Sequence, residues 1–248
     1  GAWVRVLERS PGLGMNAVIH ASGMRDADAV LDQVRDRMAA GDCRESDVAA
    51  LAAYAKAGSL RAQNNLGISY DRGCGVAQDP RVATEWLLKA AEGGLSQAMG
   101  AVAFRYGAGS GVTADPSAAL DWARRGAAAG HPFGHWALAN ALSRGWGTEV
   151  DMVASNVELR KAAEGSLAFA QTELAVRHLN GVGTARDASQ ALVWARRAVE
   201  QNDPRAMDVL AFLYEHGFGT SRNLDEAARL YERAIAAGYD SKANLERV

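Results

Sequence analysis

Residues 64–80 read NNLGISYDRGCGVAQDP, an apolar helical pattern followed by two spaced glycines and an Asp-Pro pair. The glycines follow a helix-like stretch and not a strand, and the Gly-Lys-Ser/Thr sequence of a phosphate-binding loop is absent. A glycine pair in this place is typical of a turn that ends a helix, because glycine adopts left-handed backbone at little cost. Asp79 and Pro80 then have the pattern of an N-cap and a first helical turn. The stretch therefore predicts two helices joined by a short loop.

The pattern recurs at an interval of 36 residues and gives five copies in register. In each copy, small or apolar residues mostly stand at offsets 0, 4, 5 and 8, so they share one face of a first helix. An Asp or Asn after the glycines is placed to cap a second helix. One helix pair cannot bury both of its faces, so we expect the pairs to stack and share a core. The glycine pairs are Gly73/Gly75, Gly109/Gly111, Gly145/Gly147, Gly181/Gly183 and Gly217/Gly219.

The second helix of each copy has a tryptophan or a substitute at one fixed position. We expect the tryptophans to face the core, where truncation to alanine costs roughly 3–5 kcal/mol each. The third copy departs most from the pattern, with Gly134, Leu142 and Glu158 in place of Ala, Tyr and Trp. Either its packing differs or its surface is altered for binding. The residues at the tryptophan position are Trp86, Trp122, Glu158, Trp194 and Leu230.

The motif A-x-x-x-L-G-x-x-Y-x-x-G-x-G-V-x-x-D, followed by W-x-x-K-A-A-x-x-G, is present at residues 62–79 and 86–93. It resembles the repeat of the Sel-one-like repeat (SLR) family, and the resemblance covers about residues 58–238. It implies an all-α fold, a right-handed α/α superhelical solenoid related to tetratricopeptide repeats. It also implies an adaptor role, since such proteins scaffold complexes in bacterial envelopes, signalling and host contact.

The ends of the chain are less regular than the five helix pairs of residues 58–238. Residues 26–57 contain two helical patterns, at 26–39 and 46–57, and we expect a degenerate capping helix pair there. Residues 239–248 read as the start of a C-terminal capping helix. Residues 1–25 have no clear period, and we expect an N-terminal arm that is partly foreign sequence or continues a longer parent protein.

Composition excludes several classes of function. The formal net charge of −2 gives no electrostatic case for nucleic acid, and no apolar run approaches the roughly 20 residues of a membrane span. Two cysteines, Cys43 and Cys74, are too few for a disulfide scaffold or a zinc site. They pair if their loops are neighbours; two free thiols are the alternative. An arginine- and alanine-rich chain indicates a GC-rich bacterial gene, and the compartment stays open between envelope and cytoplasm.

Catalytic patterns are absent from the sequence. It has no G-x-S-x-G element and no convincing Cys/His pair, so we predict no catalytic residues, cofactor or metal. His131 and His135 have helical spacing but lack the glutamate of a zincin motif. His178 stands at a tyrosine position, so we expect a packed, hydrogen-bonded histidine. The recurring aspartates are interpreted as helix caps and not as acid/base pairs; they are Asp79, Asp115, Asp151 and Asp187.

The resemblance to tetratricopeptide repeats implies that the first helices line a concave groove. Positions not used in packing would face a ligand there, as an apolar strip edged by basic residues. Such a strip suits an extended or helical segment with apolar anchors and carboxylates. Packing of Phe104 and Phe212 between repeats is the alternative for these two residues, and Trp146 and Phe218 are further candidates on loop tips. The groove candidates are Ile68, Arg72, Phe104, Trp136, Asn140, Arg144, Val176, Phe212 and His216.

These features predict a non-enzymatic bacterial adaptor that binds a protein or peptide partner, with no nucleic acid, no membrane span and an undetermined oligomeric state. Two alternatives fit the same repeats: an immunity or inhibitor protein that neutralises a secreted toxin, or the repeat segment of a larger envelope scaffold. A cell-wall or β-lactam-directed hydrolase is disfavoured, because the chain lacks a nucleophile constellation.

Overall fold

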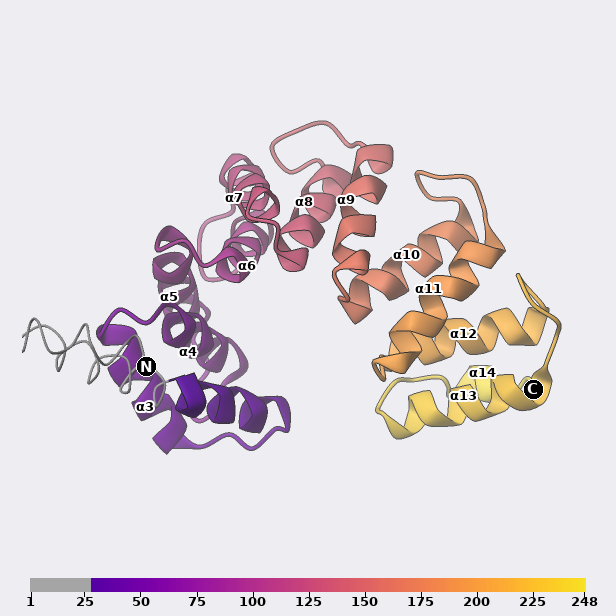
Figure 1. Cartoon of the computed structure of the whole chain (residues 1–248), viewed down its shortest axis with the longest axis horizontal. Helices are drawn as coiled ribbons and strands as arrows, with labels where there is room; N and C mark the ends of the chain where they lie inside the picture. The colour runs from indigo at the N-terminus through magenta and orange to yellow at the C-terminus, as the bar shows by residue number, and fades with distance from the viewer. Residues whose placement is uncertain (1–27) are drawn as a thin grey trace, which may run out of the picture. The chain divides into compact units, whose positions relative to one another are not determined.

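The computed structural model describes residues 28–248, and within this range all regular secondary structure is helical (Figure 1). The predicted all-α class with successive helix pairs is confirmed. The arm expected at residues 1–25 lies outside the described residues. The helices are residues 28–39, α3 (Glu45–Lys56), α4 (Leu60–Arg72), α5 (Pro80–Glu92), α6 (Ser96–Ala108), α7 (Pro116–Ala128), α8 (Pro132–Arg144), α9 (Met152–Glu164), α10 (Ala168–Asn180), α11 (Ala188–Glu200), α12 (Pro204–His216), α13 (Leu224–Ala236) and α14 (Lys242–Leu245).

The helices group into two compact units, which divide between Gly93 and Gly94. The first unit contains helix 28–39 and α3–α5, and the second contains α6–α14. In each unit a helix packs mainly on the one before and the one after it. No helix among residues 28–248 is both long and apolar enough to cross a membrane.

The two glycines of each pair have different tasks. The first ends the first helix of its copy in the left-handed conformation, for example Gly181 with φ of 74°, which confirms the predicted helix-ending turn. The second lies against the second helix of the preceding copy: a Cβ on Gly183 would stand 2.4 Å from the carbonyl oxygen of Met152, and Gly219 approaches Ala188 in the same way. The second glycine is therefore required by the contact between repeats.

The predicted caps of the second helices are present. Asp79, Asp115, Asp151, Asp187 and Asn223 each accept a hydrogen bond from a backbone N–H in the first turn of the helix that follows. Each bond satisfies a donor that has no partner within the helix. The recurring aspartates are helix caps, as the sequence indicated.

A disulfide joins Cys43 to Cys74 in the first unit, with 4.8 Å between the Cα atoms. It resolves the pairing that the sequence left open. Cys74 follows the first glycine of its pair, and the second, Gly75, packs against the carbonyl of Arg44, so the loop contact between repeats brings the two cysteines together. A crosslink that spans 31 residues stabilises a fold by about 3–4 kcal/mol.

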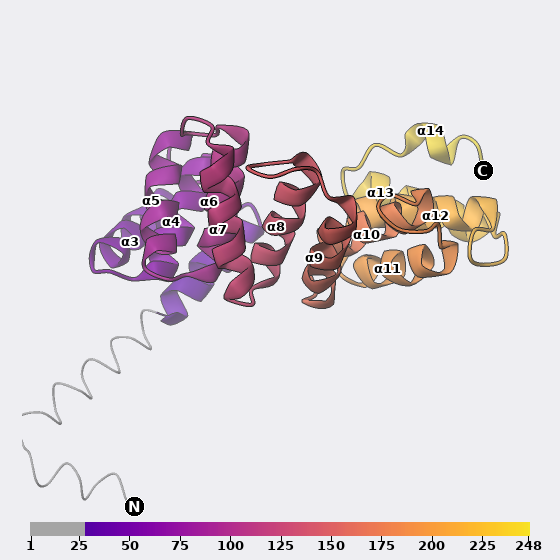
Figure 2. The ribbon, with the colours of Figure 1, turned by 90° about the horizontal axis from the view of Figure 1, so that it is seen from above.

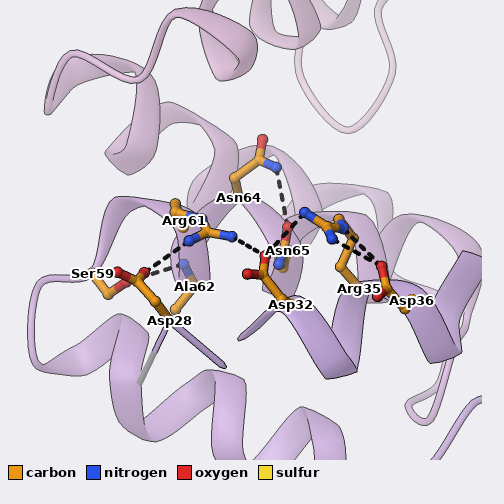
Figure 3. Close-up of polar contacts among 9 residues, drawn as sticks. All are labelled: Asp28, Asp32, Arg35, Asp36, Ser59, Arg61, Ala62, Asn64 and Asn65. Carbon is orange, nitrogen blue, oxygen red and sulfur yellow. Dashed lines mark hydrogen bonds and ion pairs between the residues drawn. The ribbon is translucent and has the colours of Figure 1, made fainter. Parts of the chain in front are cut away.

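Polar contacts attach helix 28–39 to α4 in the same unit (Figure 3). The Arg61 guanidinium donates to Asp28 at 2.8 Å and also to Asp32, both on the preceding helix. Ser59 caps the start of α4 by accepting from the backbone N–H of Ala62. Because the Arg61 pairs are largely exposed, they orient the helices more than they stabilise them.

The tryptophan position is not uniformly buried. Trp194 is 3% exposed and belongs to the core of the second unit, as predicted. Trp86 and Trp122 are only half-buried, which differs from the expectation. Both rings pack against core residues of neighbouring helices, and the cations of Lys89 and Arg125, one turn later on the same helix, lie 4.1 and 3.9 Å from their centroids.

The short helix α14 lies beside α12 and α13 in the second unit (Figure 2). Ser241 and Asn244 donate to Asp208 of α12 at 2.6 and 2.8 Å, and Leu245 packs against the core. Tyr231 donates to the Glu215 carboxylate at 2.7 Å, and burial next to this carboxylate raises the pKa of Tyr231. The contacts of Ser241 and Asn244 attach the C-terminal residues to α12, and the Tyr231–Glu215 hydrogen bond joins α13 to α12.

Candidate partner-binding site

Five aromatic side chains of the second unit form one contiguous group, here named the aromatic cluster. Trp136 lies at its centre, stacked on Phe104 with 5.5 Å between ring centroids and edge-on to Phe169 at 4.9 Å. Phe133 lies 5.1 Å from Trp136, and Trp146 lies 5.6 Å from Phe104. These separations are typical of favourable aromatic pairs. The cluster combines α6, α8, the loop after α8, and α10.

Glycines on α6 make room for two of these rings. A Cβ on Gly100 would stand 2.7 Å from the ring of Phe133, and a Cβ on Gly107 would stand 2.4 Å from the ring of Trp146. The indole of Trp146 therefore folds back over helix α6, although its position between two glycines suggested a loop tip. Any larger residue at Gly107 would displace it.

The aromatic cluster is only partly covered by the rest of the protein. All five side chains keep some exposure, and Phe169 is 39% exposed. Arg144 is exposed at the edge, with its guanidinium 5.6 Å from the centroid of Trp146. Aromatic and arginine side chains dominate the binding energy of protein interfaces, and grouped exposed apolar residues mark such surfaces.

A polar network beneath the cluster fixes the central indole. Trp136 donates through Nε1 to Glu173 at 3.4 Å. The Glu173 carboxylate also accepts from Arg177 at 2.6 Å, and Arg177, only 6% exposed, donates further to Ser155 and Asn156. Because the buried guanidinium is held by three acceptors, Glu173 and the Trp136 ring have little freedom to move.

The structure brings together three of the predicted groove residues and leaves others apart. The groove candidates Phe104 and Trp136 meet in the aromatic cluster, and the groove candidate Arg144 lies at its edge. Trp146, a loop-tip candidate, joins the same cluster. Asn140, expected to be exposed, is 7% exposed, because its side-chain amide donates to the carbonyl of Trp136 one turn earlier. Asn140 is therefore not available to a ligand.

The remaining candidates lie elsewhere. Phe212, His216 and Phe218 form a smaller group on α12 and the loop after it, with 4.2 Å between the rings of Phe212 and His216. Phe218 folds onto this group and stays 37% exposed. Val176 is half-buried on α10; in the first unit Ile68 is half-buried and Arg72 exposed.

Sequence reasoning missed Phe133 and Phe169. They are 36 residues apart, each one position before the small residue that opens its copy. The groove candidates came from offsets within the first helix, so the position just before the motif was not considered. The equal spacing of two phenylalanines was the signal that could have found them.

The third copy's departures have structural causes. A Cβ on Gly134 would stand 2.2 Å from the backbone of Gly126, so α7 and α8 approach too closely for any side chain there. Glu158 accepts from His135 and Lys161 at 2.7 Å each. Burial opposes ionisation of Glu158, but these two hydrogen bonds outweigh it and lower its pKa.

The other histidines considered in the sequence have structural contacts. His131 caps α8, its Nδ1 accepting from the backbone N–H of Phe133 at 3.1 Å, and burial lowers its pKa. His178 is 5% exposed; its Nδ1 has no hydrogen-bond partner, and its Nε2 lies 3.5 Å from the Arg160 guanidinium. Among residues 28–248, no three His, Cys, Asp or Glu side chains are grouped as a metal site.

One known family of repeat proteins matches more than half of the chain. The family model described as Sel1 repeat matches residues 60–95, 96–131, 168–203 and 204–239. The match omits residues 132–167, the copy that departs most from the motif. Among curated proteins nothing matches the chain.

Solved structures of repeat proteins match over most of the chain. A Sel1 repeat protein from Oxalobacter formigenes is 26% identical with a TM-score of 0.61, covering 75% of this chain and 77% of that one. The c5321 protein of uropathogenic Escherichia coli, a protective antigen with an SLR fold, is 25% identical with a TM-score of 0.64. The match covers 92% of this chain but only 49% of c5321. The immunity protein Pa5087 of Pseudomonas aeruginosa, at 18% identity and a TM-score of 0.60 over 85% of this chain and 81% of that one, shares the fold.

Proposed function

The chain belongs to the Sel1 repeat family, and from that premise we propose that it is a non-enzymatic scaffold whose aromatic cluster binds a segment of a partner protein. The Sel1 repeat fold is generally a protein-interaction scaffold without catalytic activity. The observation that carries the proposal is the aromatic cluster itself, five adjoining rings with Phe169 39% exposed. A lone exposed ring needs no explanation, but a contiguous group does.

The chemistry of the cluster defines the partner segment. Phe169 is exposed and Trp136 partly exposed, so the cluster offers apolar surface that suits aliphatic or aromatic anchors of a helical or extended segment. Arg144 at the edge suits a carboxylate beside those anchors, since its guanidinium is exposed. The network of Glu173 and Arg177 holds the central ring in place, so little ordering entropy is lost on binding. We therefore propose an amphipathic segment with apolar anchors and at least one acidic residue.

Selection from a library of random displayed peptides tests this proposal without knowledge of the natural partner. Peptides that bind the wild-type protein should share apolar anchors next to Asp or Glu. Their affinity should fall roughly tenfold or more in Phe169→Ala, because truncation of an exposed aromatic anchor removes a binding hot spot. Arg144→Glu should reduce the affinity of the acidic peptides alone.

Val193→Ala is the matched control. Val193 on α11 is 42% exposed and Phe169 is 39% exposed, so each variant truncates an apolar side chain of similar fractional exposure at a different place. The proposal is contradicted if the selected peptides bind the wild type, Phe169→Ala and Arg144→Glu with equal affinity. The aromatic cluster would then not be the binding surface. Calorimetric titration supplies the affinities, and circular dichroism verifies that each variant is folded.

A further inference from the structure

A cavity of about 190 Å³ lies between α9, α10 and the loop after α10, within the second unit. Its apolar wall is formed by Val153, Val157 and Leu174. Four polar side chains also line it: Asn156 and Arg160 of α9, His178 of α10 and Thr184 of the loop. None of these residues belongs to the aromatic cluster.

The position equivalent to His178, 36 residues later, has a larger side chain. Arg196 and Tyr214 correspond there to Arg160 and His178. The tyrosine hydroxyl accepts from the Arg196 guanidinium at 2.9 Å, and the guanidinium lies 5.9 Å from the centroid of the ring. Histidine is smaller than tyrosine and does not reach as far. The cavity is thus found where one repeat has lost the tyrosine that its neighbour retains.

With histidine in place of tyrosine at position 178, the hydrogen bond to the arginine of this repeat is weak. Arg160 and His178 are 3.5 Å apart, at the limit of a hydrogen bond. Burial first, and the Arg160 charge second, lower the pKa of His178, although Asp187 acts in the opposite direction. Arg160 forms no ion pair with a carboxylate in the part of the chain that the structure describes. Arg160 is exposed, so its guanidinium lines the cavity on the solvent side and has no carboxylate paired with it among residues 28–248.

Size and surroundings restrict the ligand. An apolar cavity of about 150 Å³ in another protein holds benzene, so the volume here suits a single phenyl or branched aliphatic group. Val153 and Val157 are 66% and 52% exposed, and they continue the apolar wall out to solvent. A guanidinium beside such a wall favours a carboxylate, which it binds in a planar, two-point geometry.

We propose that this cavity binds a small apolar carboxylate, with the apolar group against Val157 and Leu174 and the carboxylate accepting hydrogen bonds from Arg160. The same chemistry is present in a free organic acid and in the C-terminal residue of a peptide. Binding here is separate from the aromatic cluster, so the two sites are tested by different variants.

Titration with phenylacetate, followed by NMR of the full chain, tests the proposal. Phenylacetate should bind in the millimolar range expected for so small a molecule, and the neutral phenylacetamide should bind roughly tenfold more weakly. Arg160→Met should weaken phenylacetate binding roughly tenfold or more, because a charge-assisted hydrogen bond is lost. His178→Tyr should abolish binding by filling the cavity as Tyr214 does in the next repeat.

Arg196→Met is the matched control, since it removes the equivalent arginine next to a filled site, and phenylacetate binding should be unchanged. A peptide that ends in phenylalanine with a free carboxylate, compared with its amidated form, distinguishes the two sources. Tighter binding of the free-acid peptide than of phenylacetate indicates a partner's C-terminus, and binding of phenylacetate alone indicates a small organic acid. No binding of either to wild type, or equal binding to wild type and Arg160→Met, overturns the proposal.

Discussion

Helices α9 and α11 are built on the same plan 36 residues apart, but they place different residues in the protein. In α11, Trp194 is 3% exposed and belongs to the core. In α9 the same position is Glu158, which pairs with His135 and Lys161. The exposed Val153 and Val157 and the small cavity also lie along α9. The comparison shows that one position can change from an aromatic core residue to an ion-paired acid while the helix stays in place.

The position of the helix is kept because other residues fix where it begins and how closely it packs on its neighbours. Asp151 and Asp187 cap the two helices with the same kind of hydrogen bond. Ala162 in α9 and Ala198 in α11 are fully buried, as small residues where neighbouring helices approach. Caps and small residues fix the backbone of the repeat, and the larger side chains are then free to differ. Four experiments test this difference between the repeats.

The largest effect is expected for Trp194→Ala. Removal of a buried indole should lower the free energy of unfolding by roughly 3–5 kcal/mol, through lost burial and a cavity. Trp122→Ala, at the same position of α7 but half-buried beneath Arg125, should cost clearly less, about 1–2 kcal/mol. Urea denaturation followed by circular dichroism measures both. Equal costs would contradict the difference in burial.

The next effect concerns the contact that holds α9 against the loop after α10. Gly183→Ala should destabilise the fold by about 1–3 kcal/mol more than Gly130→Ala, since its Cβ would collide with the carbonyl of Met152. Gly130 also has positive φ, but nothing lies within 4 Å of a Cβ there, so it reports the backbone strain alone. An equal decrease in the free energy of unfolding in the two variants would mean that the backbone near Met152 moves to accommodate the new Cβ at little cost.

A smaller effect is expected from the acid that replaces tryptophan in α9. Because the pKa of Glu158 is lowered in the folded state, its contribution is present above the usual glutamate pKa. It is lost as the pH falls through the lowered value. Glu158→Gln should cost about 1 kcal/mol at pH 6 and progressively less towards pH 3. Urea denaturation at several pH values measures the gap between variant and wild type, and a gap that does not narrow on acidification would exclude this role.

The smallest effect is expected at the exposed valines. Val157→Ser in α9 and Val193→Ser in α11 should each change the free energy of unfolding by less than about 0.5 kcal/mol, because both side chains are 42% exposed or more. Thermal and urea denaturation test this. A loss above 1 kcal/mol at Val157 alone would show that the wall of the cavity supports α9, and would remove the argument that it is free for a ligand.

Much of the fold could be predicted because the same signals for helix starts and helix ends recur in five copies of the repeat. Helix ends at Gly73 and Gly181 and caps at Asp79 and Asp187 depend on local backbone chemistry, which the motif displays directly. The candidate site was predicted in part. Phe104 and Trp136 were groove candidates from the resemblance to tetratricopeptide repeats, whereas Phe133 and Phe169 lie before the motif and meet Trp136 only through packing of different helices.

The repeat length, the alternation of two helices in each copy and the residues that start and end each helix can be read from the sequence, because they follow from interactions within a few residues along the chain. Which tryptophan is buried, that Cys43 meets Cys74, that Asn140 turns inward and that a cavity lies beside His178 are known only from the three-dimensional packing. Each of these outcomes depends on how closely neighbouring helices and loops approach, and that distance is set by all the side chains between them.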